Sequence, residues 1–304
     1  MRIRSRTLRI AMALAVAASS EDSQSPAPNP VPAPAPASST AADVAAMAEE
    51  AYRRESWSEC AELYARASTL AESGANAGSS YNAACCFALA GDADGAFGEL
   101  ARSIGAGYRD AAHLQQDTDL TSLHDDARWT EAVAQVESAY DTYLSGINAE
   151  LLTLYEQDQA DRRAASYDDI DWSVVAPRDE QRRNRVSEII AAGEAKAADD
   201  YYHAAMVLQH GSEPEHFRTA HEWALRAVEL DPDHDRAKWL AAATEDRYLM
   251  NLGKPQKYGT QFRKEGDGRW ALYQVDPSIT DAERAEWNVP PLHESQSRAE
   301  QMNR

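Results

Sequence analysis

One pattern of small and large residues recurs three times in this chain, at a constant spacing of 36 residues. Each copy begins with a small residue, has a large residue four positions later and has a small residue again seven positions after the first. The copies cover residues 60–67, 96–103 and 132–139. These offsets lie on one face of a helix, and small residues there let a second helix pack closely. The pattern therefore predicts an array of helical hairpins over residues 41–142.

The array resembles the tetratricopeptide repeat, whose second helix carries Ala, an aromatic residue and Ala at these offsets. Tyr64 keeps the aromatic residue, whereas Leu100 and Val136 depart from it. The first helices of the first two hairpins are expected over about 41–54 and 79–90. Such arrays hold a peptide or protein in their groove, so the resemblance implies a protein or peptide partner.

An Asp-rich segment, HLQQDTDLTSLHDDARW (113–129), occupies the place of the third hairpin's first helix. It resembles the terminal unit that closes such arrays. Asp117 and Asp119 in this segment allow two interpretations, cation binding and helix capping. Capping is preferred, because the segment lacks the Gly and the closing Glu of a calcium-binding loop.

A second helical group is expected to follow from about residue 147. YDDIDWSVVAPRDE (167–180) is expected to separate its first two helices, and Gly253 is typical of the left-handed cap that ends its last one. Short runs rich in Thr, Phe, Trp, Tyr and Val flank Gly266-Asp267-Gly268, which indicates a β-hairpin. The five helices are expected over about 147–166, 181–194, 199–210, 215–230 and 234–253.

The predicted fold is therefore mainly α. Tetratricopeptide-like helical hairpins over 41–142 are followed by a second helical domain with a small C-terminal β-hairpin over 147–293, and by a disordered tail over 294–304.

The N-terminus has the features of an export signal. MRIRSRTLR carries four arginines and no acid, and IAMALAVAA is an apolar run of nine residues. The pattern predicts a signal peptide over residues 1–20, cleaved near Ala18 or Ser19, and an exported protein, periplasmic or secreted. A disordered basic tail and an organellar transit peptide are the alternatives. Because a membrane-spanning helix needs about 20 residues, no membrane insertion is expected after cleavage. The following prolines predict a disordered Pro/Ala-rich linker over 21–40.

Charge and cysteine content narrow the possible partners. A net charge of −20 repels nucleic-acid phosphates and anionic lipids, so a neutral, cationic or protein partner is expected. Cys60, Cys85 and Cys86 are expected to be buried free thiols, with a disulfide between Cys60 and either of the others as the alternative. Cys and His spacings typical of metal sites are missing from the sequence, so no metal and no cofactor are expected.

Several motifs of the second half occur in the order found in one bacterial domain family. They are DQADR (158–162), LQHG (208–211), EDRYL (245–249), GKPQKYGTQ (253–261) and a DGRWALYQV run. Together they resemble DUF6624, a family of unknown function. The resemblance implies a helical domain that is often exported and sometimes joined to tetratricopeptide units. This chain has Gly211-Ser212 where the family commonly has Ala-Asp after the histidine.

Side chains from these motifs suit an acid–base site. An imidazole, a carboxylate to orient it, and guanidinium and amide groups can together hold a carboxylate or carbonyl substrate. The alternative is a polar network in which the groups satisfy one another. The candidate residues are Gln209, His210, Asp246, Arg247, Gln256, Tyr258, Thr260 and Gln261.

Two functions follow. The first is an exported helical-repeat module that binds a protein or peptide, and the alternative is an enzyme, a hydrolase, built around His210, Arg247 and GKPQKYGTQ. Convergence of the candidate residues in one concave pocket would favour the enzyme. Gly259 is expected where a β-carbon would obstruct the chain. Gln261 is expected to be buried near Arg247 and His210, and Gln261→Ala to change ligand binding while barely lowering the melting temperature.

Overall fold

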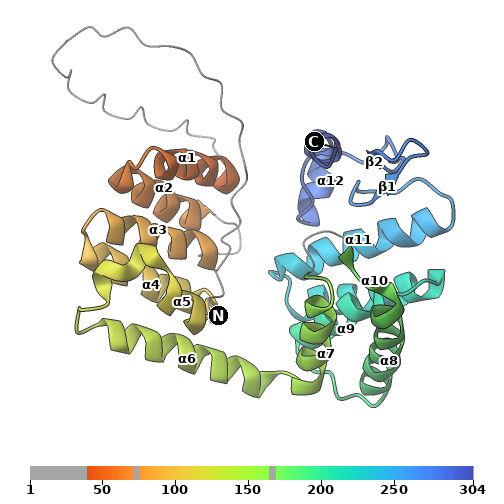
Figure 1. The fold of residues 1–304 in the computed structure, drawn as a ribbon, viewed down its shortest axis with the longest axis horizontal. Helices are drawn as coiled ribbons and strands as arrows, with labels where there is room; N and C mark the ends of the chain where they lie inside the picture. Colours follow the sequence, from red (N-terminus) through yellow and green to blue (C-terminus); the bar gives the residue numbers. More distant parts are fainter. Residues whose placement is uncertain (1–39, 71–75, 164–168, 304) are drawn as a thin grey trace, which may run out of the picture. The chain divides into compact units, whose positions relative to one another are not determined.

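The computed structural model describes residues 40–70, 76–163 and 169–303, and its regular structure is almost entirely helical (Figure 1). This confirms the mainly α prediction. The elements of the first half are α1 (Ala41–Arg53), α2 (Trp57–Leu70), α3 (Ala77–Leu89), α4 (Ala93–Gly105), α5 (Ala111–Gln116), the 3-10 helix η1 (Thr118–Leu123) and α6 (Trp129–Gly146).

The second half adds further helices and one small sheet. Strands β1 and β2 are antiparallel, with Phe262 opposite Leu272 and Lys264 opposite Trp270, so the predicted C-terminal β-hairpin is confirmed. The elements are α7 (Ala149–Ala160), α8 (Trp172–Ala191), α9 (Ala198–Leu208), α10 (Pro214–Leu230), α11 (Asp235–Asn251), β1 (Phe262–Lys264), β2 (Trp270–Leu272), α12 (Asp281–Glu286) and α13 (Leu292–Gln301).

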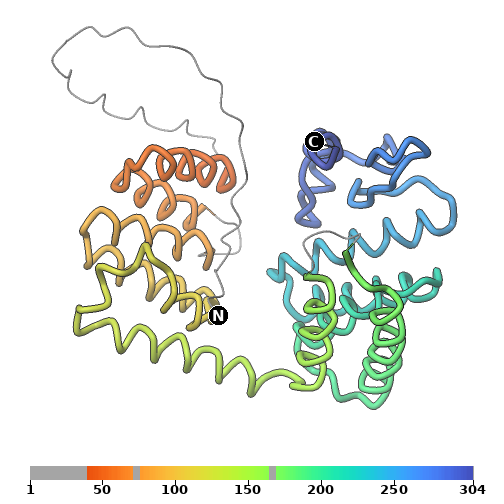
Figure 2. Tube along the Cα trace, in the orientation of Figure 1, coloured from red at the N-terminus to blue at the C-terminus, as the bar shows by residue number. Residues whose placement is uncertain are grey.

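Helices α1 to α4 run back and forth as successive hairpins, which the chain trace of Figure 2 shows. The repeated positions form the core between them. Cys60, Ala96, Leu100 and Val136 are all almost completely buried. The face with period 36 is therefore the packing face, as the sequence predicts.

The N-terminal predictions concern residues that the structure leaves undescribed. The signal peptide and nearly all of the linker lie outside the described residues, which begin at Thr40. Thr40 itself caps α1, since its hydroxyl accepts the backbone N–H of Asp43 at 3.1 Å. Among the helices that the structure describes, none has the length and apolar character needed to cross a membrane.

Helix α8 begins earlier than expected. Asp171 caps it through the backbone N–H of Ser173, and the helix continues through Pro177. The expected break over 167–180 is thus wrong for its second half. A proline inside a helix removes one hydrogen bond, but here the helix buries Val175 and brings Asp179 to an ion pair with Arg162, just after α7.

The tail expected to be disordered also forms a helix. Ser295 and Ala299 of α13 are buried, and the Asn303 side chain after it bonds the backbone N–H and carbonyl of Trp270 on β2, at 2.7 and 2.8 Å. The prediction failed because residues 294–304 are mostly polar, although one face of the helix packs on the β-hairpin. The disordered tail over 294–304 is therefore corrected to helix α13 over most of its length.

The cysteines are not all free. Cys60 and Cys86 form a disulfide, and Cys85 is a buried free thiol. The preferred expectation of three free thiols is wrong, and the alternative with Cys86 holds. The packing of α2 on α3 places the two Cα atoms 5.8 Å apart, a distance that suits a disulfide.

Candidate functional site

Asp246 on α11 organises the GKPQKYGTQ segment. It is completely buried, and its carboxylate accepts the backbone N–H groups of Lys257, Tyr258 and Thr260 at 2.6, 2.9 and 3.0 Å. Burial raises the pKa of Asp246, although these hydrogen bonds oppose the shift. Asp246 therefore folds the turn that follows its helix, and the expected pairing with His210 is replaced by this role.

Gln256 and Gln261 tie the turn together. The Gln256 amide donates to the carbonyls of Gln261 and Tyr273, at 3.0 and 2.9 Å, and its oxygen accepts the backbone N–H of Gln261 at 2.8 Å. The Gln261 amide donates to the Ala243 carbonyl at 3.1 Å, and its side chain is buried as predicted. Both amides thus act inside the fold.

Gly259 and Tyr258 fix the outer side of the turn. Gly259 has a φ of +87°, and a β-carbon there would lie 3.3 Å from the Leu292 side chain at the start of α13, so the prediction for this glycine is confirmed. Tyr258 is buried, and its carbonyl accepts Nε of the buried Arg284 at 3.0 Å. The turn is therefore held on two sides.

Arg247 connects the turn to the end of α9. Its Nε donates to the side-chain oxygen of Gln261 at 3.1 Å, and its Nη1 donates to the Gln209 carbonyl at 3.0 Å. Gln209 is buried, and its own amide contacts the Met206 sulfur. The predicted proximity of Arg247 and Gln261 is confirmed, and Arg247 links them to the residue beside His210.

His210 has a carboxylate partner that the sequence did not identify. Its Nδ1 lies 2.9 Å from Asp158, which is completely buried on α7, and its carbonyl accepts Nη1 of Arg183 at 3.2 Å. Burial lowers the pKa of His210, while the Asp158 carboxylate opposes that shift. At neutral pH the imidazole is therefore neutral, and Asp158 orients it.

Asp158 belongs to a buried ion network between α7 and α8. Arg162 bonds Asp158 at 2.9 Å and Asp179 at 2.6 Å, and Arg182 bonds Asp179 and Asp161. The pairing of Asp158 with Arg162 could have been found from the sequence, because the two lie four residues apart at the polar end of an amphipathic helix. The part that Asp179 plays could not have been found in this way, since Asp179 lies in the segment expected as a break.

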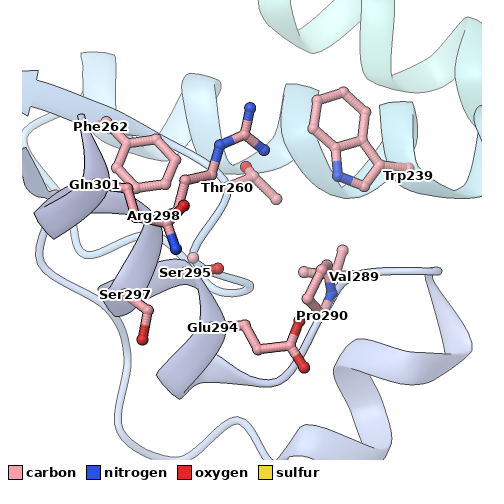
Figure 3. A pocket seen from close by; sticks show the side chains of 11 residues that line it. Trp239, Thr260, Phe262, Val289, Pro290, Glu294, Ser295, Ser297, Arg298 and Gln301 are labelled. Carbon is pink, nitrogen blue, oxygen red and sulfur yellow. The ribbon is translucent and has the colours of Figure 1, made fainter. Parts of the chain in front are cut away.

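Cavities open elsewhere on the described chain. One of about 340 Å³ lies beside the turn and is lined in part by Gly259 and Thr260 (Figure 3). Two others, of about 830 and 660 Å³, share Gly107, Arg109 and Tyr143. None of the three is lined by Gln209, His210, Arg247, Gln256 or Gln261. Hydrogen bonds link Gln209, Arg247, Gln256 and Gln261, whereas the hydrogen bonds of His210 go to Asp158 and Arg183.

Tyrosines of the hairpin array form a second polar cluster. Tyr52 on α1 donates to Asp119 at 2.7 Å, and Tyr81 on α3 donates to Asp117 at 2.9 Å. Tyr108 stacks on Tyr81, with ring centroids 4.5 Å apart. Burial raises the pKa of Asp119, and the charge of Asp117 adds to that shift. The cluster connects the first helices of successive hairpins to η1.

The capping interpretation holds for Asp117, whereas Asp119 lies inside η1 and accepts the Tyr52 hydroxyl. The second oxygen of Asp117 accepts the backbone N–H of Asp119 at 3.0 Å, which caps η1. Ligand atoms of Cys85 and both aspartates lie within 4.8 Å of one another. Burial raises the pKa of the Cys85 thiol, which donates to Asp117. In this structure Asp117 accepts the Cys85 thiol, and Asp119 accepts the Tyr52 hydroxyl.

Comparisons of the chain with protein-family models, with curated proteins and with solved structures found no match.

Proposed function

We propose that this chain is an exported helical-repeat protein that binds a protein or peptide partner through the first helices of its hairpins. The observation that carries the proposal is the exposed Tyr52 at the edge of a cluster with Tyr108, the buried Tyr81, Asp117 and Asp119, which joins α1, α3 and η1. Tyrosines offer a large apolar face together with a hydroxyl, and they are enriched where binding energy concentrates at interfaces.

The charge of the cluster indicates the chemistry of the partner. Two aspartates lie among the tyrosine rings in a protein with a net charge of −20. An acidic partner would be repelled, whereas a neutral or basic segment would be attracted and its association accelerated at low salt. A basic or neutral peptide is therefore the best fit.

A pull-down from the native host tests this proposal. The bait is the purified chain, and Tyr52→Ala removes an aromatic residue that is 36% exposed. Tyr140→Ala on α6, where the tyrosine is 38% exposed, is the matched control. A specific partner retained by the wild type and the control but lost with Tyr52→Ala supports the proposal. Equal capture by all three baits contradicts it.

Export is part of the same proposal. The basic and apolar N-terminal segments support it, and the Cys60–Cys86 disulfide fits an oxidising compartment. Mass spectrometry of the protein from its native host tests it: an N-terminus near Ala18 or Ser19 is expected, and an intact Met1 contradicts export.

The second candidate function is an enzyme, a hydrolase, at His210. The observation that favours it is the Asp158–His210 pair, in which a buried carboxylate holds Nδ1. Among the described residues Nε2 has no hydrogen-bond partner, which leaves it able to accept a proton from a water or hydroxyl. A resemblance to DUF6624 fits either candidate, since that family has no established activity.

Ester cleavage tests the second candidate. Purified wild type is incubated with p-nitrophenyl acetate, and His210→Gln and His216→Gln are compared with it. His216 lies on α10 and is the matched control. Activity above background that disappears only with His210→Gln supports the hydrolase. Equal rates for all three proteins contradict it.

A further inference from the structure

The cavity beside the GKPQKYGTQ turn has walls from several separate parts of the chain (Figure 3). Trp239 comes from α11, Thr260 from the turn, and Glu294 and Arg298 from α13. Its volume of about 340 Å³ is at the small end of ligand pockets. A ligand of one residue fits such a volume, whereas a folded partner does not.

Two opposite charges face this cavity without pairing. Glu294 and Arg298 lie four residues apart on α13, the spacing at which such residues ordinarily form an ion pair. Neither has an ion pair or a side-chain hydrogen bond among the described residues, and both line the cavity. Figure 3 shows them on opposite sides of it. A carboxylate and a guanidinium are thus both available to one ligand.

The rest of the wall is apolar. Trp239 is 38% exposed although it is the largest side chain type, and its ring faces the cavity across from α13 in Figure 3. Val289, Pro290 and Phe262 also line the cavity. An apolar group that covered the indole would remove exposed apolar surface from water, which favours binding.

The walls are held in place before any ligand arrives. Asp246 fixes Thr260 through two hydrogen bonds, and the close approach of Leu292 to Gly259 sets the start of α13 against the turn. At its other end α13 is tied to β2 through Asn303. A preorganised pocket loses little conformational entropy on binding. The hydrogen bonds of the turn would therefore favour ligand binding as well as stabilise the fold.

We propose that this cavity binds a free α-amino acid with a large apolar side chain. Arg298 takes the carboxylate, Glu294 takes the ammonium group, and the side chain packs on Trp239 and Val289. The site is independent of peptide binding by the hairpins, because it uses none of the same residues.

Calorimetric titration of the full chain with L-phenylalanine at neutral pH tests the proposal. Saturable binding at one site is expected, and Glu294→Gln or Arg298→Gln is expected to weaken it by about tenfold each. Both residues are exposed, so neither change threatens folding. Glu300→Gln, also exposed on α13 but outside the cavity, is the control and is expected to bind like the wild type.

Two modified ligands assign the charges. N-acetyl-L-phenylalanine lacks the ammonium group, so it is expected to bind more weakly and to be insensitive to Glu294→Gln. L-Phenylalaninamide lacks the carboxylate and is expected to be insensitive to Arg298→Gln. Absence of saturable binding by phenylalanine, leucine and methionine at millimolar concentration overturns the proposal. So does binding that neither variant weakens.

Discussion

Both the backbone N–H and the hydroxyl of Thr260 donate to a single carboxylate oxygen of Asp246, at 3.0 and 2.8 Å. The other oxygen accepts the N–H groups of Lys257 and Tyr258. One buried side chain therefore determines the path of the GKPQKYGTQ turn, which forms a wall of the cavity beside it. The GKPQKYGTQ motif therefore has a structural role. Its effect on a ligand comes from the cavity wall that it holds in position.

Replacing Asp246 should destabilise the protein markedly. Asp246→Asn keeps the shape but turns an NH₂ group toward backbone donors, which leaves buried N–H groups unpaired at a cost of about 1–3 kcal/mol each. We expect the free energy of unfolding, measured by urea denaturation, to fall by at least about 2 kcal/mol. Glu245→Gln, which breaks only the partly exposed pair with Lys257, should cost less than about 1 kcal/mol. Equal effects of both changes would show that the turn does not depend on Asp246.

Gln261→Ala should lower stability, in contrast to the small change in melting temperature expected from the sequence. The variant removes two hydrogen bonds inside the fold, one from Arg247 Nε to the Gln261 oxygen and one from the Gln261 amide to the Ala243 carbonyl. Each such bond contributes about 0.5–1.5 kcal/mol, and more where one partner is charged. Thermal denaturation of Gln261→Ala beside Gln296→Ala, an exposed glutamine of α13, measures the difference. A melting temperature equal to that of the wild type would restore the ligand-binding interpretation.

The features that could be predicted from the sequence are those that depend on residue spacing and on neighbouring side chains. The hairpins followed from small residues at Cys60, Ala96 and Ala132, because a helix face is encoded by spacing alone. The burial of Gln261 followed from its polar neighbours, since a simple strand edge does not need them. The positive φ of Gly259 followed from its place between a helix cap and a strand.

Contacts between distant segments could not be predicted in the same way. Asp158 and His210 are 52 residues apart in the sequence. The choice of Cys86 over Cys85 depends on which side of α3 meets α2, and adjacent cysteines do not reveal it. The segment over 167–180 was expected as a break, but tertiary contacts of Val175 and Asp179 outweigh the helical hydrogen bond that is lost at Pro177.

Removing the carboxylate of Asp158 should lower the pKa of His210 further. Burial lowers that pKa, and the contact with Asp158 is what opposes the shift. With Asp158→Asn only the lowering contributions remain. NMR titration of the His210 ring in the variant and the wild type measures the change. A pKa that rises in Asp158→Asn would contradict the assigned pairing.

Breaking the disulfide should destabilise the hairpin array. Cys60 and Cys86 are 26 residues apart, and a cross-link of this kind restricts the unfolded chain. Its loss typically costs about 2–4 kcal/mol. We expect Cys60→Ser to show such a fall in urea denaturation under oxidising conditions, and to respond no further to a reductant. Cys85→Ala, which removes the free thiol, is the control and should retain the response to reductant that the wild type shows.

The last prediction concerns pH and the buried histidine of α9. His203 is 3% exposed, its Nδ1 has no hydrogen-bond partner among the described residues, and its ring stacks on Tyr155 at 4.6 Å. Burial lowers its pKa to about 4, against 6.5 for an ordinary histidine. Between these values the unfolded chain binds a proton that the folded chain excludes, so stability is complete above about pH 6.5 and falls as the pH drops toward 4.

The loss from His203 alone amounts to about 3 kcal/mol across that window. His210 contributes with the same sign, because burial lowers its pKa too. The charged groups that act on His203 are Asp199, Asp200, His234 and Arg236, and they remain in the comparison variant. His203→Phe keeps an aromatic ring against Tyr155 but cannot titrate. Urea midpoints measured from pH 7.5 to pH 4.5 should therefore fall less steeply for His203→Phe than for the wild type, and identical slopes would mean that His203 is protonated in the folded chain as readily as in the unfolded one.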